Sequence, residues 1–340
     1  MQSQGKEFSE FFVGPARLRV ISDGAADIAT MVEAEKRVIH AFADRDLWRH
    51  EAVTLFILEN LAPLVGQLRQ LHGLTDQQAE QLPQRPMVNL YDLRNPRECF
   101  IFINLQVMSS EGYWNDALTA EGLLAHEHAH PVGECPATAA ARPLRVTADT
   151  PAMAMPLLTQ LGETLSTGAL SELFANDICI ANGFDAALAH ICGKTIDRAV
   201  ANLAQRPELV RRLAAAGSSG TWDAHHERLL LLLADAQAAL PFSLEISPFF
   251  RTGQTRSGAA LEDALRGNLL ARMEPEVREM FAAIHDLFLK PHRDWDAPQV
   301  ESWCREVLAM LSTAFSRSGE RVVLRLSDDD SPAPSMRPPS

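Results

Sequence analysis

The sequence has no excess of basic residues, because its 31 Lys and Arg are outnumbered by 44 Asp and Glu, which gives a formal net charge of −13. A surface that binds phosphate groups needs a basic excess. We therefore expect neither nucleic acid nor an anionic membrane as the main partner.

Long apolar runs are also lacking. The longest run of leucines covers residues 229–233 and is closed by Asp235, whereas a helix that spans a bilayer needs about 20 apolar residues. Residues 1–10 are polar and of mixed charge, without the apolar segment that follows the basic start of a secretory signal. These absences predict a soluble, cytoplasmic protein with no membrane partner.

Paired cysteines are the third absence. The five cysteines are scattered and form no CxxC pair, which is typical of reduced thiols that pack as small apolar residues. Cys135 lies five residues past His130 but has no partner at ligand spacing, so an ordinary loop cysteine is the favoured interpretation for it. The five are Cys99, Cys135, Cys179, Cys192 and Cys304.

The chain does contain one motif with clear chemistry, His126-Glu127-x-x-His130, which follows an apolar stretch at residues 123–125. On a helix, His126 and His130 lie one turn apart on the same face, so both imidazoles can reach one ion. Glu127 lies beside the first ligand, where its carboxylate can take a proton from a metal-bound water. The motif predicts a Zn²⁺ site on a helix that begins at Asp116 and ends at Pro131.

A catalytic zinc needs a third protein ligand. Glu172 stands in an apolar helical segment, and a buried Glu without a partner is costly, so a metal is a natural partner for it. A half-exposed Glu at a helix start is the alternative. Asp177 is a rival ligand, and it points about 140° away from Glu172 on one helix. Asn176 shares the face of Glu172.

The pattern His126-Glu127-x-x-His130 followed by Glu172-x-x-Ala175-Asn176 resembles the gluzincin metallopeptidases, and most of all the ImmA/IrrE-type intracellular proteases. The resemblance covers residues 87–184. It implies that His126, His130 and Glu172 bind zinc and that Glu127 is the catalytic base. It also implies that Asn176 holds a ligand in orientation.

The predicted fold is α+β and predominantly helical. A β-hairpin at about 87–108 packs on the site helix, and helical regions lie on both sides. We expect a helical region at 1–85, a metallopeptidase core at 86–242, a helical region at 243–326 and a disordered tail at 327–340. Residues 53 to about 73 read as a helix, 131–155 as a loop, 243–258 as a flexible connection and 321–326 as a final strand. Further helices are expected at 156–165, 170–182, 186–203, 207–215, 222–240, 261–270, 275–289 and 300–315.

The predicted function is hydrolysis of a peptide bond in a cytoplasmic protein substrate, with Glu127 activating a zinc-bound water. We also expect a protein partner or inhibitory segment that restrains the enzyme. A helical regulatory protein with a structural or inactive zinc site is the first alternative, and a zinc hydrolase of another class is the second. His128 should point away from the ion, His190 is a candidate electrophile, and Tyr113 is either an oxyanion donor or an aromatic packed at the helix start.

Overall fold

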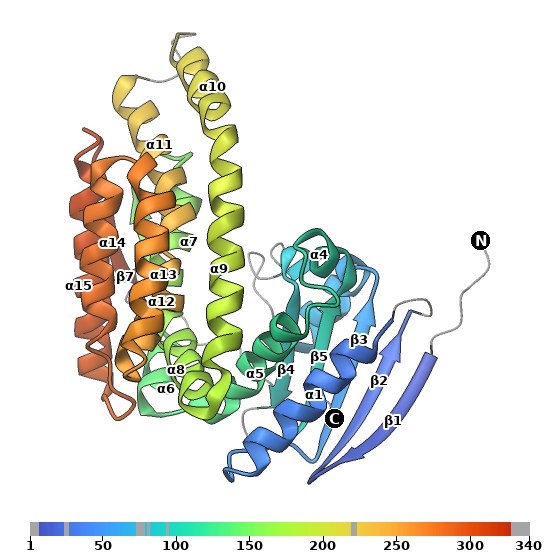
Figure 1. The fold of residues 1–340 in the computed structure, drawn as a ribbon. Coiled ribbons are helices and arrows are strands. Elements are labelled where there is room, and N and C mark those ends of the chain that lie inside the picture. Colours follow the sequence, from blue (N-terminus) through green and yellow to red (C-terminus); the bar gives the residue numbers. More distant parts are fainter. Residues whose placement is uncertain are drawn as a thin grey trace. The chain divides into compact units, whose positions relative to one another are not determined.

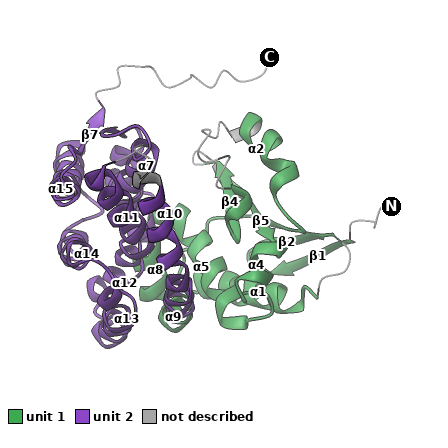
Figure 2. Cartoon of the chain, turned by 90° about the horizontal axis from the view of Figure 1, so that it is seen from above, with its two compact units in different colours: residues 1–133, 175–191 green, residues 134–174, 192–340 purple. Residues whose placement is uncertain are grey.

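The computed structural model describes residues 7–23, 27–72, 79, 82–92, 95–218 and 223–327 (Figure 1). The chain has the predicted α+β fold, with a five-stranded mixed sheet, a two-stranded sheet and many helices. It divides into unit 1, residues 1–133 and 175–191, and unit 2, residues 134–174 and 192–340 (Figure 2). The helices α8 (Ala169–Cys179) and α9 (Asp185–Asn202) are each shared by both units.

The five-stranded sheet belongs to unit 1 and has the strand order β1-β2-β3-β5-β4. Its strands are β1 (Glu7–Val13), β2 (Ala16–Ser22), β3 (Ala52–Leu58), β4 (Met87–Asp92) and β5 (Asn95–Asn104). The central pairs β2-β3 and β3-β5 are parallel, and the outer pairs β1-β2 and β4-β5 are antiparallel. The predicted hairpin is therefore confirmed as β4-β5, although residues after Asn104 form the short helix α4 (Leu105–Ser110).

Each face of this sheet has its own apolar core, because side chains alternate along a strand. Val53, Leu55 and Ile57 of β3 pack in a buried cluster with residues of α1 (Ala29–Ala43) and α5 (Ala117–Gly133). Phe56 and Leu58 belong to a second cluster with Leu68 of α2 (Val65–His72). The site helix α5 thus lies beside α1 on one face of the sheet (Figure 1).

The prediction of a purely helical region at 1–85 was wrong, because three of the five strands fall within it. Strand β3 occupies the first six residues of the stretch from 53 to about 73 that reads as a helix. A central parallel strand is covered on both faces, so its sequence is almost continuously apolar and also matches helical spacing over a short stretch.

Unit 2 is mostly helical and holds the two-stranded sheet. The predicted helices from residue 156 onward and the predicted final strand are confirmed, with ends that shift by a few residues. Its elements beyond α8 and α9 are α6 (Pro136–Ala141), β6 (Arg145–Asp149), α7 (Met155–Leu165), α10 (Arg206–Ser218), α11 (Ala224–Ala239), α12 (Phe242–Arg251), α13 (Thr255–Asn268), α14 (Pro275–Phe288), α15 (Ala297–Ser316) and β7 (Val323–Ser327).

Two stretches that were predicted to be a loop and a flexible connection contain regular secondary structure, so both predictions were wrong. The stretch 131–155 contains the end of α5 together with α6 and β6, and β6 pairs with β7. The stretch 243–258 contains most of α12 and the start of α13. In α12 the buried side chains Phe242, Ile246 and Phe249 recur at helical spacing, and their burial outweighs the cost of Pro248 inside the helix. Of the predicted tail at 327–340, only Ser327, which ends β7, lies within the described residues.

Among the described residues, no single helix is long and apolar enough to cross a membrane. One bent pair, α11 with α12 at 42°, meets the length and composition test only when the two helices are taken together.

Candidate metal centre

The site helix α5 begins as predicted. The carboxylate Oδ1 of Asp116 accepts a hydrogen bond from the backbone N–H of Thr119 at 3.1 Å, which is the bond that an N-cap residue makes. Leu124, His128 and Ala129 are buried on one side of α5, whereas His126 and His130 are only half-buried. The helix therefore has a core-facing side and a side that is partly exposed to solvent.

Pro131 does not end α5 as predicted, because the helix continues to Gly133. A proline inside a helix has no N–H to donate to the carbonyl four residues earlier, which here is the carbonyl of Glu127. That carbonyl accepts a hydrogen bond from the side-chain amide of Asn89 on β4 instead, at 2.6 Å. The lost helical bond is thus replaced by a bond between the site helix and the edge strand.

This replacement predicts a coupling between the two residues. Asn89→Ala should lower the free energy of unfolding by about 1–3 kcal/mol, because it leaves the Glu127 carbonyl without its donor. In a Pro131→Ala background the cost should be smaller, because an alanine at this position restores the backbone N–H. Urea unfolding of the two single variants and the double variant measures the coupling. An equal cost of Asn89→Ala in both backgrounds would show that the bond does not replace the helical one.

The structure brings the three predicted ligands together. The ligand atoms of His126, His130 and Glu172 lie within 4.8 Å of one another. The two imidazole rings have centroids 4.7 Å apart and planes at 83°. Glu172 is on α8, whose continuation from Ala175 belongs to unit 1 along with α5. Two imidazoles and one carboxylate form the donor set of many catalytic zinc sites, so these residues fit the ion that the motif predicts.

Asn176 lies against the first ligand. Its side-chain oxygen is 2.9 Å from Nδ1 of His126. When Nδ1 donates its proton to this oxygen, Nε2 keeps its lone pair for a metal, and the ring is fixed in orientation. Asn176 is buried and one helical turn from Glu172, so α8 carries both a predicted ligand and the residue that contacts another predicted ligand.

The other predicted candidates are placed elsewhere. Asp177 is not part of the group that Glu172 forms with the two histidines. His190 is 2.7 Å from the carboxylate of Asp116, about 15 Å along α5 from His126, so it is no electrophile for this site. Tyr113 is buried in the core cluster before α5, which supports the packing interpretation. Cys135 precedes α6 and belongs to no ligand group among the described residues.

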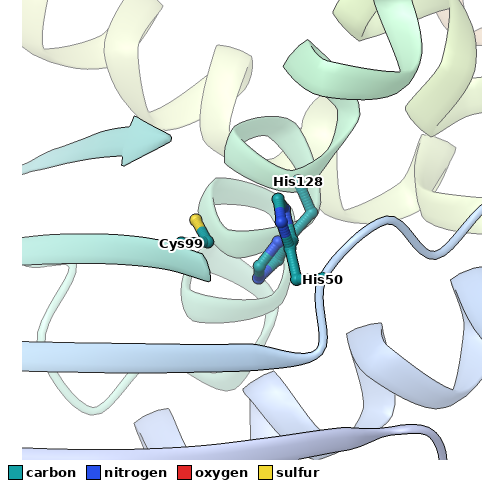
Figure 3. A group of neighbouring side chains, drawn as sticks. All are labelled: His50, Cys99 and His128. Carbon is teal, nitrogen blue, oxygen red and sulfur yellow. The ribbon is translucent and has the colours of Figure 1, made fainter. Parts of the chain in front are cut away.

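A second group of side chains was missed in the sequence. His128 does point away from the first group, as predicted, but its Nε2 lies 2.8 Å from a carboxylate oxygen of Glu35 on α1. His128 also lies near His50 and Cys99, and the ligand atoms of these three are within 4.8 Å of one another (Figure 3). One signal was available: Glu35 interrupts the apolar face that Met31, Val38 and Ile39 form in the sequence of α1.

The electrostatics of this second group follow from its burial. Burial, with a smaller contribution from His128, lowers the pKa of His50 to about 4, so its imidazole is neutral at physiological pH. Burial, and then the carboxylates of Glu35 and Glu127, raise the pKa of the Cys99 thiol well above its ordinary value. A thiolate at Cys99 therefore requires a cation beside it.

Comparison of the chain with protein-family models, with curated proteins and with solved structures gave no match. The resemblance to gluzincins thus depends on the motif residues alone.

Proposed function

We propose that the protein is a zinc metallopeptidase that hydrolyses a peptide bond of a cytoplasmic protein substrate. The observation that carries this proposal is the grouping of His126, His130 and Glu172, which come from two helices and stand 42 residues apart at their widest gap (130 to 172). Chance placement of these three side chains is a weaker explanation than a metal site, because half-buried imidazoles and a carboxylate have no apolar packing role to explain their grouping.

The metal ion and the side chains would have different roles in the hydrolysis. A zinc ion held by these residues would polarise the scissile carbonyl and acidify a water molecule. Glu127, next to His126 on the half-buried side of α5, takes the proton from the attacking water and delivers it to the leaving amine. Asn176 keeps the ring of His126 in orientation throughout.

The position of β4 favours an extended peptide as substrate. This strand is the last in the sheet order, and β5 is its only strand neighbour in the part of the chain that the structure describes. It is also bonded to the site helix through Asn89 and the carbonyl of Glu127. An extended peptide that adds to this edge by main-chain hydrogen bonds would run beside the catalytic carboxylate.

Metal content tests the proposal. The variant with both His126→Ala and His130→Ala should bind about one zinc per chain fewer than the wild type, because two of three ligands are lost. Zinc is measured by atomic absorption after dialysis against metal-free buffer, and circular dichroism checks that the variant is folded. Equal zinc in the two proteins would show that His126 and His130 do not bind the metal, and would leave the motif without a function.

A further inference from the structure

We propose that His50, Cys99 and His128 form a second metal site, a buried structural Zn²⁺ site that is separate from the catalytic group. The three residues come from different parts of unit 1: His50 from the loop before β3, Cys99 from β5 and His128 from α5 (Figure 3). Their exposed fractions are 3%, 1% and 1%. The site does not depend on the proposed peptidase activity, because it shares no ligand with the catalytic group.

The two histidines are arranged as metal ligands are. In each ring one nitrogen has a partner, since Nδ1 of His50 is 2.5 Å from the carbonyl of Pro96 and Nε2 of His128 is 2.8 Å from Glu35. The other nitrogen of each ring, Nε2 of His50 and Nδ1 of His128, is buried and has no hydrogen-bond partner among the residues that the structure describes. A metal-bound imidazole shows this division, with the second nitrogen donating to a carbonyl or a carboxylate.

Two imidazole nitrogens that are buried and have no partner in the described part of the chain cost free energy unless something binds them. The third donor is the sulfur of Cys99, whose side chain is on the same face of β5 as the buried Ile101 and Ile103. Ligand atoms around one zinc lie on the order of 3.5 Å apart. Because the three ligand atoms are within 4.8 Å of one another, the side chains have to close by at most about 1.3 Å to bind it.

Ligand chemistry selects the ion. A metal-bound cysteine is a thiolate and a metal-bound histidine is a neutral imidazole, so the three ligands together bring one negative charge to the cation. Two imidazoles and a thiolate suit Zn²⁺ among the divalent ions. The burial of the group sets it apart from a catalytic zinc site, which keeps an open position.

The test uses the full chain with His126→Ala and His130→Ala, so that the catalytic group no longer binds. This protein should retain about one zinc after dialysis. X-ray absorption at the zinc edge should show a sulfur neighbour at about 2.3 Å, which the catalytic group cannot supply because it contains no cysteine. After exchange of zinc for Co²⁺, the protein should show a thiolate-to-cobalt charge-transfer band in the near ultraviolet.

Adding Cys99→Ala should abolish the band and the residual zinc, whereas adding Cys179→Ala should leave both unchanged. Cys179 is a matched control, because it is buried in the same core cluster but lies outside the ligand group. The absence of residual zinc in the folded double-histidine variant, or zinc with only nitrogen and oxygen neighbours, would overturn the proposal. The absorption spectrum decides this even where Cys99→Ala does not fold. Loss of peptidase activity has no bearing on either result.

Discussion

Glu127→Gln is expected to lower the rate of peptide cleavage by about a hundredfold or more, because the amide keeps the shape of the side chain but cannot accept the proton of the attacking water. Zinc content should be unchanged, since the three ligands remain. The rate is measured on a library of unstructured peptides, with mass spectrometry to identify the cleaved bonds. The variant and the wild type should have the same circular dichroism spectrum.

A second glutamate on the same helix gives the matched control. Glu121 lies on α5 and pairs with Arg37 at 2.8 Å, on the side of α1. Glu121→Gln should therefore leave cleavage unchanged within about twofold, as expected for the loss of one surface ion pair. If the wild type cleaves nothing in the library and Glu127→Gln matches it in every cellular assay, a regulatory protein with a silent metal site becomes the better description.

The helices after residue 156 were predictable because their apolar side chains recur at a regular period and local signals mark their ends. Asp296 caps α15, and Gly183, with a φ of 91°, provides the positive angle that commonly follows a helix. Pro131 and Pro248 misled the prediction, since proline is an unfavourable residue in a helix but not a forbidden one. In α5 the deficit is met by Asn89, which stands 42 positions away in sequence (131 − 89), too far for any local rule to detect.

The group of His126, His130 and Glu172 was easier to predict than the five-stranded sheet. The spacing of His126 and His130 fixes their geometry on one helix, and Glu172 stands out as an acid among apolar neighbours. The buried group of His50, Cys99 and His128 has no such spacing, because its members come from a loop, a strand and a helix that meet only in the folded chain. The periodicity of a sequence indicates which face of a single helix or strand is apolar. It does not indicate which of these faces pack against one another in the folded chain.

The two acids on α8 should differ sharply in their effect on zinc. Glu172→Ala is expected to lower zinc affinity by about a hundredfold or more, since it removes a direct ligand. Asp177→Ala should leave the affinity nearly unchanged, because Asp177 lies about 140° around the helix from Glu172 and outside the ligand group. The zinc affinities of the two variants are ranked by the release of zinc to chelators of graded strength.

Asn176→Ala makes the comparison quantitative. Its side chain touches the ring of His126, so its loss should lower zinc affinity by about 10- to 100-fold, which places it between the two acids. The variant with His126→Ala and His130→Ala measures the zinc that is bound elsewhere in the chain. This amount is subtracted from the zinc content of each of the other variants. A larger effect of Asp177→Ala than of Glu172→Ala would assign the third ligand to Asp177. It would also remove the match to the gluzincin pattern, because the spacing to Asn176 depends on Glu172 as the ligand.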